Sequence, residues 1–397
     1  MLAPFGIRPK GTLLARMLPL AQALNRRGHC VVIVAPPVSN PEDAGTRVDH
    51  AGVVVIHTPL PMLSGPAGVA MQVISLVRAA LHEQPAILHV FKPKGYSGLA
   101  ARAIHMGYPQ LPLVVDTDDW EGWGGWNDLL PYPYAAKLLF AWQERDLPRC
   151  AAAVTVASRT LETQVWGFGV PPGRVVLVAN GAESGERRIQ NSKFEIQNSE
   201  LRTQNSELKT QPLTLLLYTR FWEFDMRALV VALVAIAGRG PQVRVLVVGR
   251  GERGEERELL RLAARAGIGA LIDYRGWVEP QAIPALLTSV DVALVPLADT
   301  LINRARGLAK LLELMQAGLP IVAHAVGQAG EYLEHGVSGL LVPPGDTAAF
   351  VRAALALLDD PTLRQRLGAG AQMRATARYS WDRIAEDAQR AYQMALF

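Results

Sequence analysis

Two series of short, mainly apolar segments constrain the fold of this chain more than any other sequence feature. Segments with the apolar spacing of helices lie between several of them. One such segment has its apolar face from Leu14 to Leu24, and Gly28 stands where the carboxyl-terminal cap of this helix is expected. Strands that are apolar throughout and alternate with helices indicate a parallel sheet covered on both faces, so an α/β fold is predicted. The predicted strands are residues 31–35, 52–57, 86–91, 113–115 and 152–157 in the first series, and 213–218, 243–248, 271–274, 292–295 and 321–323 in the second.

The polar stretch at residues 187–211 marks the domain boundary. Gln-Asn-Ser recurs there at 190, 197 and 204, but apolar residues are too sparse for the two seams of a coiled coil, which favours a low-complexity insertion. A chain of 397 residues is also about twice the usual domain size. We predict a first domain at 1–186, a linker at 187–211, a second domain at 212–378, and a helix at 379–397 that packs back on the first domain.

The composition excludes several classes of protein. Half of the residues are apolar, and 40 basic residues against 36 acidic ones leave a net charge of only +4, which gives no indication of nucleic-acid binding. The two cysteines, Cys30 and Cys150, are far apart and belong to no metal-type cluster, so a reducing compartment fits. We expect neither a metal nor another cofactor.

The sequence also bears on location. No apolar run reaches the roughly 18 residues of a membrane span, and the amino terminus lacks the basic, apolar and small-residue regions, in that order, of a signal peptide. We expect a cytoplasmic protein, and a peripheral contact with the inner face of the membrane stays open. Because a first strand of three residues, Met1 to Ala3, is short, we also expect the gene product to begin upstream.

Short motifs follow the predicted strands in a fixed order. Together they resemble the retaining glycosyltransferases of the GT-B fold, most closely family 4 (group 1), over nearly the whole chain outside 187–211. The resemblance implies two facing Rossmann-like domains, the first for an acceptor and the second for a nucleotide-sugar donor. It implies a hexosyltransferase that modifies a glycan or lipid-linked hydroxyl with retention, in cell-surface glycan or glycolipid synthesis. The motifs are residues 248–251, 276–278, 291–296, 310–322 and 336–343, with Gly11-Thr12, Arg16, 24–29 and Asn180-Gly181 in the first half.

The chemistry of a nucleotide sugar agrees with several of these positions. Two phosphates and a ribose diol require cations and a carboxylate, and the resemblance places Arg220 on the diphosphate and Glu313 on the ribose. Lys310 lies one helical turn before Glu313, on the same helix face. The alternatives are a solvated loop charge for Arg220 and an exposed helix pair for Lys310 and Glu313. The other donor-binding candidates are Gly11, Arg227, Gly249, Trp277, Val278, Arg306 and Gly307.

Three positions depart from the family's pattern. Ala305 stands where a second glutamate is usual, so we expect backbone N–H groups near Arg306 and Gly307 to replace its contact. Asp225 stands where a lysine is expected, and Arg227 would substitute for it. Lys10 precedes Gly11 where a glycine pair is usual. These departures motivate an alternative function, a catalytically degenerate nucleotide-sugar-binding protein.

Two acidic residues complete the catalytic candidates, which are Asp118, Asp119, Arg220 and Lys310. The resemblance matches Asp118 and Asp119 with a His-Asp pair whose histidine faces the transferred sugar, so Asp118 would replace that histidine. The alternatives are carboxylates that cap the next helix and a metal-binding motif at 116–118. No enzyme nucleophile is found, and in the front-face route that the resemblance implies, the leaving diphosphate takes the acceptor's proton while Arg220 and Lys310 stabilise its charge.

Two further patterns admit other interpretations. Residues 249–254 spell the dinucleotide fingerprint, with Asp273 about 20 residues later, which leaves an NAD(P)-dependent oxidoreductase as a rival function. The stretch from Trp120 to Trp142 is rich in aromatic residues, which could stack on sugar rings, rest at a membrane interface or pack in the core.

Overall fold

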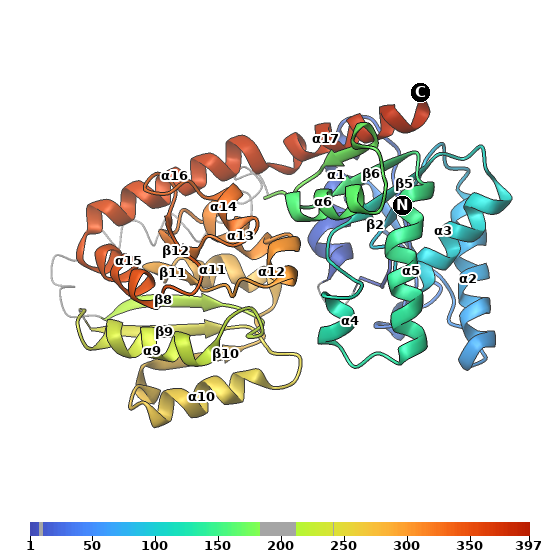
Figure 1. The fold of residues 1–397 in the computed structure, drawn as a ribbon. Coiled ribbons are helices and arrows are strands. Elements are labelled where there is room, and N and C mark those ends of the chain that lie inside the picture. Colours follow the sequence, from blue (N-terminus) through green and yellow to red (C-terminus); the bar gives the residue numbers. More distant parts are fainter. Residues whose placement is uncertain (8–10, 183–211, 241) are drawn as a thin grey trace. The chain divides into compact units, whose positions relative to one another are not determined.

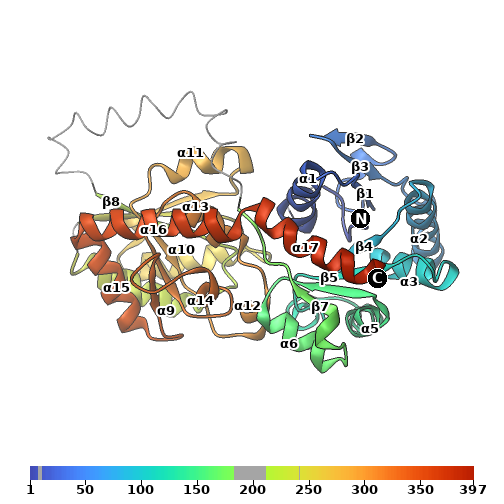
Figure 2. The same ribbon diagram turned by 90° about the horizontal axis from the view of Figure 1, so that it is seen from above.

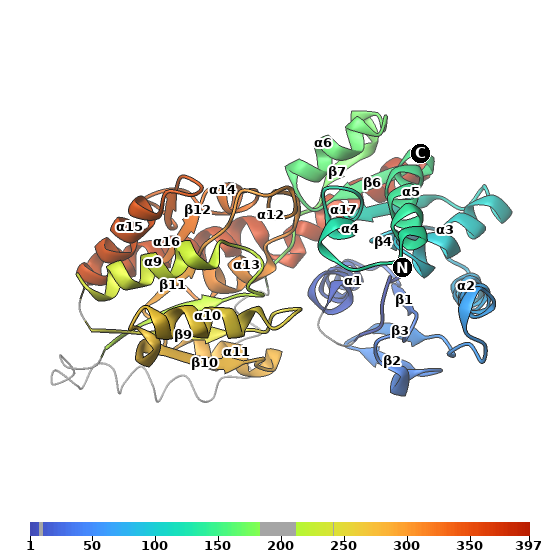
Figure 3. The same ribbon diagram turned by 60° about the horizontal axis from the view of Figure 1, so that its bottom comes forward.

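The computed structural model describes residues 1–7, 11–182, 212–240 and 242–397, so Lys10 and the predicted insertion at 187–211 lie outside the described residues. The chain divides into two compact units. Unit 1 comprises Met1–Gly181, Arg304–Gly307 and Trp381–Phe397, and unit 2 comprises Ala182–Asn303 and Leu308–Ser380. Each unit consists of strands flanked by helices (Figures 1 and 3), which confirms the predicted α/β class.

The strands of unit 1 form a three-stranded sheet in the order β1-β3-β2 and a four-stranded sheet in the order β4-β5-β6-β7. Leu2 joins them, because it pairs in parallel with both Val34 and Val90. The strands pair in parallel except β2, which runs antiparallel to β3 and is mostly exposed. Because β2 consists mostly of polar residues, the apolar pattern of the sequence did not predict it as a strand. The strands are β1 (Val32–Ala35), β2 (Arg47–His50), β3 (Val53–His57), β4 (Leu88–Phe91), β5 (Leu113–Thr117), β6 (Ala153–Val156) and β7 (Val175–Leu177).

The helices of unit 1 cover its sheets (Figure 2). A π-helical segment, Leu13–Met17, leads directly into the first α-helix. The α-helices are α1 (Leu18–Arg26), α2 (Gly65–His82), α3 (Tyr96–Gly107), α4 (Trp126–Leu129), α5 (Tyr134–Cys150), α6 (Arg159–Gly167) and α17 (Trp381–Leu396).

The carboxyl-terminal helix α17 packs on unit 1, against α1 and the strands β5, β6 and β7 (Figure 2). Its buried residues recur every three or four positions, as expected of a helix with one apolar face. At the rim, Arg26 of α1 donates to Asp382 at 2.6 Å and Arg27 donates to Gln389 at 2.7 Å. The buried residues are Trp381, Ile384, Ala385, Ala388 and Ala391.

Unit 2 contains a six-stranded, all-parallel sheet in the order β10-β9-β8-β11-β12-β13. The chain runs outward from β8 to one edge and then from β11 to the other, so its direction of progress reverses between these two central strands. In such sheets ligands bind beyond the carboxyl ends of the strands at that reversal. The strands are β8 (Leu213–Tyr218), β9 (Val243–Val248), β10 (Ile272–Gly276), β11 (Val292–Val295), β12 (Ile321–His324) and β13 (Leu340–Val342).

Helices flank this sheet on both faces (Figures 1 and 3). Among the described residues, no helix combines the length and the apolar character that crossing a bilayer requires. The helices are α9 (Met226–Ala237), α10 (Glu255–Arg265), α11 (Ile283–Leu287), α12 (Leu301–Ala305), α13 (Ala309–Gln316), α14 (Ala329–Tyr332), α15 (Thr347–Asp359) and α16 (Pro361–Tyr379).

Candidate functional site

Three of the predicted donor residues gather around Tyr218, the last residue of β8. The Lys310 ammonium lies 4.5 Å from the centroid of the Tyr218 ring. The Tyr218 hydroxyl forms a hydrogen bond with Glu313, and the charge of Arg220 also acts on it. Burial raises the pKa of Tyr218 far above its usual range, with the charge and hydrogen bond of Glu313 adding to the effect. A guanidinium, an ammonium and a carboxylate therefore lie together at the carboxyl end of a central strand.

A buried carboxylate holds the loop that carries Arg220. Glu223, 5% exposed, accepts the backbone N–H of Arg220 at 2.9 Å and a short hydrogen bond from the Thr219 hydroxyl. Phe221, which follows, has a φ of 71° and donates its N–H to the Thr219 hydroxyl oxygen at 2.8 Å. A non-glycine residue in this left-handed region costs free energy and persists only where surrounding contacts enforce it. The loop is thus fixed by contacts with its own buried side chains.

Gly249 allows the end of β9 to approach this loop. A Cβ atom at that position would lie 1.8 Å from the Thr219 carbonyl oxygen, and the φ of 128° is one that side chains rarely adopt. Only glycine fits such a close backbone contact. Gly249 therefore supports the backbone beside Arg220.

A second charged cluster lies at the carboxyl ends of β4 and β5 in unit 1. The Lys92 ammonium is 2.5 Å from Asp119, 3.0 Å from Glu121 and 3.8 Å from Asp118. Burial lowers the pKa of Lys92, but the three carboxylates outweigh it and hold that pKa well above the ordinary value. The Thr12 hydroxyl donates to Asp118 at 3.0 Å. Sequence reasoning found Asp118 and Asp119 but missed Lys92 and Glu121.

The environment of Asp118 favours its neutral form more than that of an ordinary aspartate. Burial raises the pKa of Asp118 to about 7, and the charge of Asp119 adds to this while Lys92 opposes it. The alternative that these carboxylates cap the next helix is wrong, because Gly125 occupies the N-cap of α4. Asp118 can therefore donate or accept a hydrogen bond near neutral pH.

The aromatic stretch after β5 is partly core and partly surface. The Lys94 ammonium forms a short ion pair with Glu121 and lies 4.5 Å from the ring centroid of Tyr132. Trp126 is buried, whereas Trp123 and Tyr134 are 47% and 68% exposed, with ring centroids 6.4 Å apart. The stretch thus combines core packing with an exposed aromatic pair.

Glu144 of α5 anchors the loop that carries this stretch. Its carboxylate accepts the backbone N–H groups of Glu121 at 2.7 Å and Gly122 at 3.0 Å. Burial raises the pKa of Glu144 to about 7, although these hydrogen bonds oppose the change.

A buried network underlies the charged cluster of unit 1. Arg16 donates to both carboxylate oxygens of Asp116, at 2.9 and 2.7 Å, and to Asn180 at 2.9 Å. Since Asp116 is committed to this ion pair, the metal-binding interpretation of residues 116–118 is not supported. Among the described residues, no three His, Cys, Asp or Glu side chains are grouped so as to hold a metal ion.

Family models match both halves of the chain. Residues 11–181 match the glycosyl transferase 4-like domain, and residues 213–360 match the glycosyl transferases group 1 domain. The chain belongs to the group 1 glycosyltransferases. The predicted family is therefore confirmed, and the oxidoreductase alternative is wrong.

Curated relatives of this group 1 glycosyltransferase match part of it. Phosphatidyl-myo-inositol mannosyltransferase of Mycobacterium leprae is 35% identical over 169 residues, which is 42% of each chain. D-inositol 3-phosphate glycosyltransferase of Geodermatophilus obscurus is 37% identical over 142 residues, 35% of this chain and 29% of that protein. The matched stretch thus spans less than half the length of these two relatives.

Solved structures show the fold over nearly the whole length. Sucrose-phosphate synthase from Thermosynechococcus elongatus has a TM-score of 0.74 at 20% identity, and the match covers 99% of this chain and 97% of that one. Anabaena Alr3699/HepE in complex with UDP and glucose has a TM-score of 0.71 at 20% identity, with 99% and 98% covered. The fold of this glycosyltransferase is GT-B, as predicted.

Two of the three departures from the family pattern lie among the described residues, at Asp225 and Ala305. Asp225 caps α9, where it accepts the backbone N–H groups of Arg227 at 2.8 Å and Ala228 at 3.0 Å. Arg227 is exposed, and its charge acts on Glu258 of α10. The structure therefore gives Asp225 a role in starting the helix.

The segment Arg304–Gly307 clusters with unit 1, whereas Lys310 and Glu313 belong to unit 2. Ala305 is fully buried, and its carbonyl oxygen accepts a hydrogen bond from Ser158. A Cβ atom on Gly307 would lie 2.3 Å from the Asn180 amide nitrogen, so this glycine permits a close approach. The predicted backbone donors near Arg306 and Gly307 thus lie in a segment packed within unit 1.

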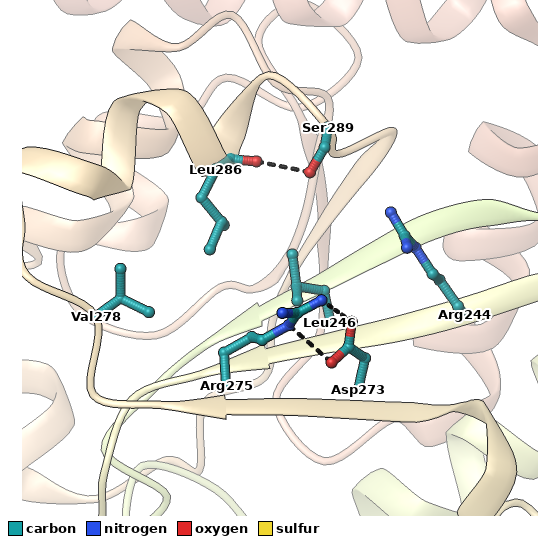
Figure 4. Close-up of a pocket in the computed structure, with 7 residues that line it drawn as sticks. All are labelled: Arg244, Leu246, Asp273, Arg275, Val278, Leu286 and Ser289. Atoms are coloured by element: carbon teal, nitrogen blue, oxygen red, sulfur yellow. Dashed lines mark hydrogen bonds and ion pairs between the residues drawn. The ribbon is translucent and has the colours of Figure 1, made fainter.

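The two predicted base-binding residues follow β10. Trp277 is 51% exposed and donates its ring N–H to Glu279 at 3.3 Å. Val278 lines a cavity of about 280 Å³ between the β9–β10 face and α11 (Figure 4). The other lining residues are Arg244, Leu246, Asp273, Arg275, Leu286 and Ser289.

The dinucleotide fingerprint does not form a phosphate site. The backbone N–H of Gly251 is bound by Glu256 at 3.0 Å and that of Arg253 by Glu255 at 2.7 Å. Carboxylates in the first turn of α10 thus occupy the groups that a diphosphate would need, and they would repel it. Asp273 pairs with Arg275 at 2.8 Å (Figure 4).

Proposed function

We propose that this protein transfers a hexosyl group from a nucleotide-sugar donor to an acceptor hydroxyl with retention of configuration. The observation that carries the proposal is the grouping of Arg220, Lys310 and Glu313 around Tyr218 at the reversal between β8 and β11. This is where doubly wound sheets bind ligands. One carboxylate and two cations are the groups that a ribose diol and a diphosphate require.

Each residue has a distinct task in this proposal. Glu313 accepts hydrogen bonds from the ribose hydroxyls, while the guanidinium of Arg220 pairs with diphosphate oxygens. Lys310 adds a second positive charge, so the negative charge that develops on the leaving diphosphate is stabilised without a metal ion. The diphosphate then takes the acceptor's proton in the front-face route.

The remaining candidates act on the base and on the transferred sugar. Backbone groups of Trp277 and Val278 would hold the base edge. Asp118, with a pKa raised to about 7, would exchange hydrogen bonds with the transferred sugar, and Lys92 keeps it in place beside Asp119. Gly11, Gly249, Arg306, Gly307 and Arg227 complete the proposed donor-binding set.

The relatives suggest the class of acceptor. The names of two curated relatives specify transfer to an inositol lipid and to an inositol phosphate, and the solved structure of Anabaena HepE contains UDP and glucose. We propose a polyhydroxylated acceptor, either a glycan or a lipid-linked headgroup, in cell-surface glycan or glycolipid synthesis. The proposed location is the cytoplasm, with peripheral contact at the inner face of the membrane.

The test is release of nucleoside diphosphate from a panel of nucleotide sugars, with and without crude lipid and glycan acceptors. We expect release from at least one donor that increases with acceptor and continues in the presence of EDTA. Buried Ala305 offers no second carboxylate, which keeps the degenerate binding protein as a second candidate. Binding of a nucleotide sugar without release, under all acceptors, would favour that candidate over catalysis.

A further inference from the structure

Tyr218 was not singled out by the sequence, yet it contacts two of the donor residues. It is the last residue of β8, two positions before Arg220, and it is partly buried. Its ring lies under the Lys310 ammonium at 4.5 Å from the centroid. A lysine this close to an aromatic face is attracted by the ring's negative surface, and the attraction grows as water is excluded.

The hydroxyl of Tyr218 acts on the second residue, Glu313. The two side chains share a hydrogen bond, and the pKa of Tyr218 is raised so far that the phenol stays protonated. An ionised carboxylate can only accept, so the phenol is the donor in this bond. One lone-pair site of Glu313 is thereby occupied, and rotation of the carboxylate is restricted.

A fixed carboxylate matters for a diol more than for a single hydroxyl. Two vicinal O–H groups can be satisfied together only when both carboxylate oxygens are correctly oriented, whereas one hydroxyl can follow a rotating acceptor. We propose that Tyr218 is a positioning residue that makes the donor site select ribose over 2′-deoxyribose, by orienting Glu313 while its ring holds Lys310. This inference rests on the proposed function, because it assumes that Glu313 binds the ribose.

The test measures the affinities of UDP, GDP and ADP, and of their 2′-deoxy counterparts, by isothermal titration calorimetry. For the nucleotide that binds, the wild type is expected to prefer the ribose form by about tenfold or more, since a hydrogen bond to a charged group is worth about 1.5–3 kcal/mol. Tyr218→Phe should reduce that ratio several-fold, mainly through weaker binding of the ribose form. Tyr218→Leu should weaken both forms further, because the ring under Lys310 is lost.

Two controls separate positioning from general damage. Tyr379→Phe removes a hydroxyl from the same unit, one that donates to the Glu331 carbonyl oxygen at 3.0 Å, and should leave both affinities and their ratio unchanged. In a Glu313→Gln background, Tyr218→Phe should have little further effect on the ratio, because residues that act together are non-additive. This double-mutant cycle compares ratios within each protein, so a modest loss of stability does not affect it.

The outcomes are distinguishable. If no ribonucleoside diphosphate binds the wild type, the donor site itself is wrong, and with it the proposed function. If one binds and Tyr218→Phe keeps the wild-type ratio, the role of Tyr218 is overturned while the donor site stands. A ratio that falls equally in the Tyr379→Phe control would also overturn the positioning role.

Discussion

Arg16 and Asp116 form a two-pronged ion pair that is almost closed to water, with side-chain exposures of 2% and 0%. Asp116 also accepts the Thr155 hydroxyl at 2.6 Å, and Thr155 lies 3.3 Å from a ring nitrogen of His89. The other ring nitrogen of His89 meets the Tyr392 hydroxyl of α17 at 2.8 Å. A continuous series of polar side-chain contacts thus connects the π-helical segment at Leu13–Met17, the centre of the sheet and the carboxyl-terminal helix of unit 1.

Asp116→Ala is expected to destabilise unit 1 by about 3–5 kcal/mol, because it leaves the buried Arg16 guanidinium without its counter-ion. Urea unfolding followed by far-UV circular dichroism measures this change. The double substitution Arg16→Met with Asp116→Leu should recover part of the loss. A cost below about 1 kcal/mol for Asp116→Ala would show that water or another group replaces the carboxylate.

The pH dependence of stability should contain a contribution from Glu144. Its folded pKa of about 7 lies above the ordinary glutamate value of 4.5, so the folded state retains the proton over that interval. The stabilisation is complete below pH 4.5 and is lost as the pH rises through 7, a change of about 3 kcal/mol. The difference in unfolding free energy between wild type and Glu144→Gln should therefore vary between pH 4.5 and 8. A constant difference would exclude this titration.

Asp118→Asn should change the pH profile of turnover rather than abolish binding of the donor. The wild type is expected to show an inflection near pH 7 in kcat/KM, from the raised pKa of Asp118, and the variant should lack it. Glu144→Gln serves as the control, because the carboxyl group of Glu144 titrates in the same range, but its role is to anchor a loop. If Asp118→Asn keeps the inflection of the wild type, Asp118 takes no part in the reaction.

Gly249→Ala should weaken nucleotide binding through the loop of Arg220. The added Cβ would overlap the Thr219 carbonyl oxygen at 1.8 Å and strain a φ of 128°. Gly267→Ala, also at positive φ but with nothing within 4 Å of the new atom, is the matched control for backbone strain alone. Calorimetric titration should show a loss of nucleotide affinity in Gly249→Ala only. Equal losses in the two variants would show that the overlap with the Thr219 carbonyl oxygen is not the cause.

The sequence predicted the order of strands and helices well where periodicity is strong. Buried strands such as Val292–Val295 consist of consecutive apolar residues, so they were recognised, whereas the exposed β2 carries no such signal. The parallel pairing that dominates the sheets of both units followed from this order. The antiparallel edge strand did not, because it depends on pairing with β3 rather than on its own residues.

The candidate site was predicted only where motifs define it. Arg220, Lys310 and Glu313 stand at motif positions, and the structure brings them together. Tyr218, Lys92 and Glu121 were missed because their importance comes from contacts between segments far apart in the sequence. The fingerprint at 249–254 had the right spacing for a phosphate site, but the glutamates of α10 occupy its N–H groups, which spacing alone does not reveal.

In the proposed function, Arg220 and Glu313 act directly on a nucleotide-sugar donor. The most direct measurement is steady-state turnover of the donor identified in the panel by wild type, Arg220→Ala and Glu313→Ala, with thermal unfolding as the check on folding. Each substitution is expected to lower kcat/KM at least about tenfold in a folded protein, since each removes a charged hydrogen-bonding group. Folded variants of both residues that turn over the donor at the wild-type rate would contradict the account.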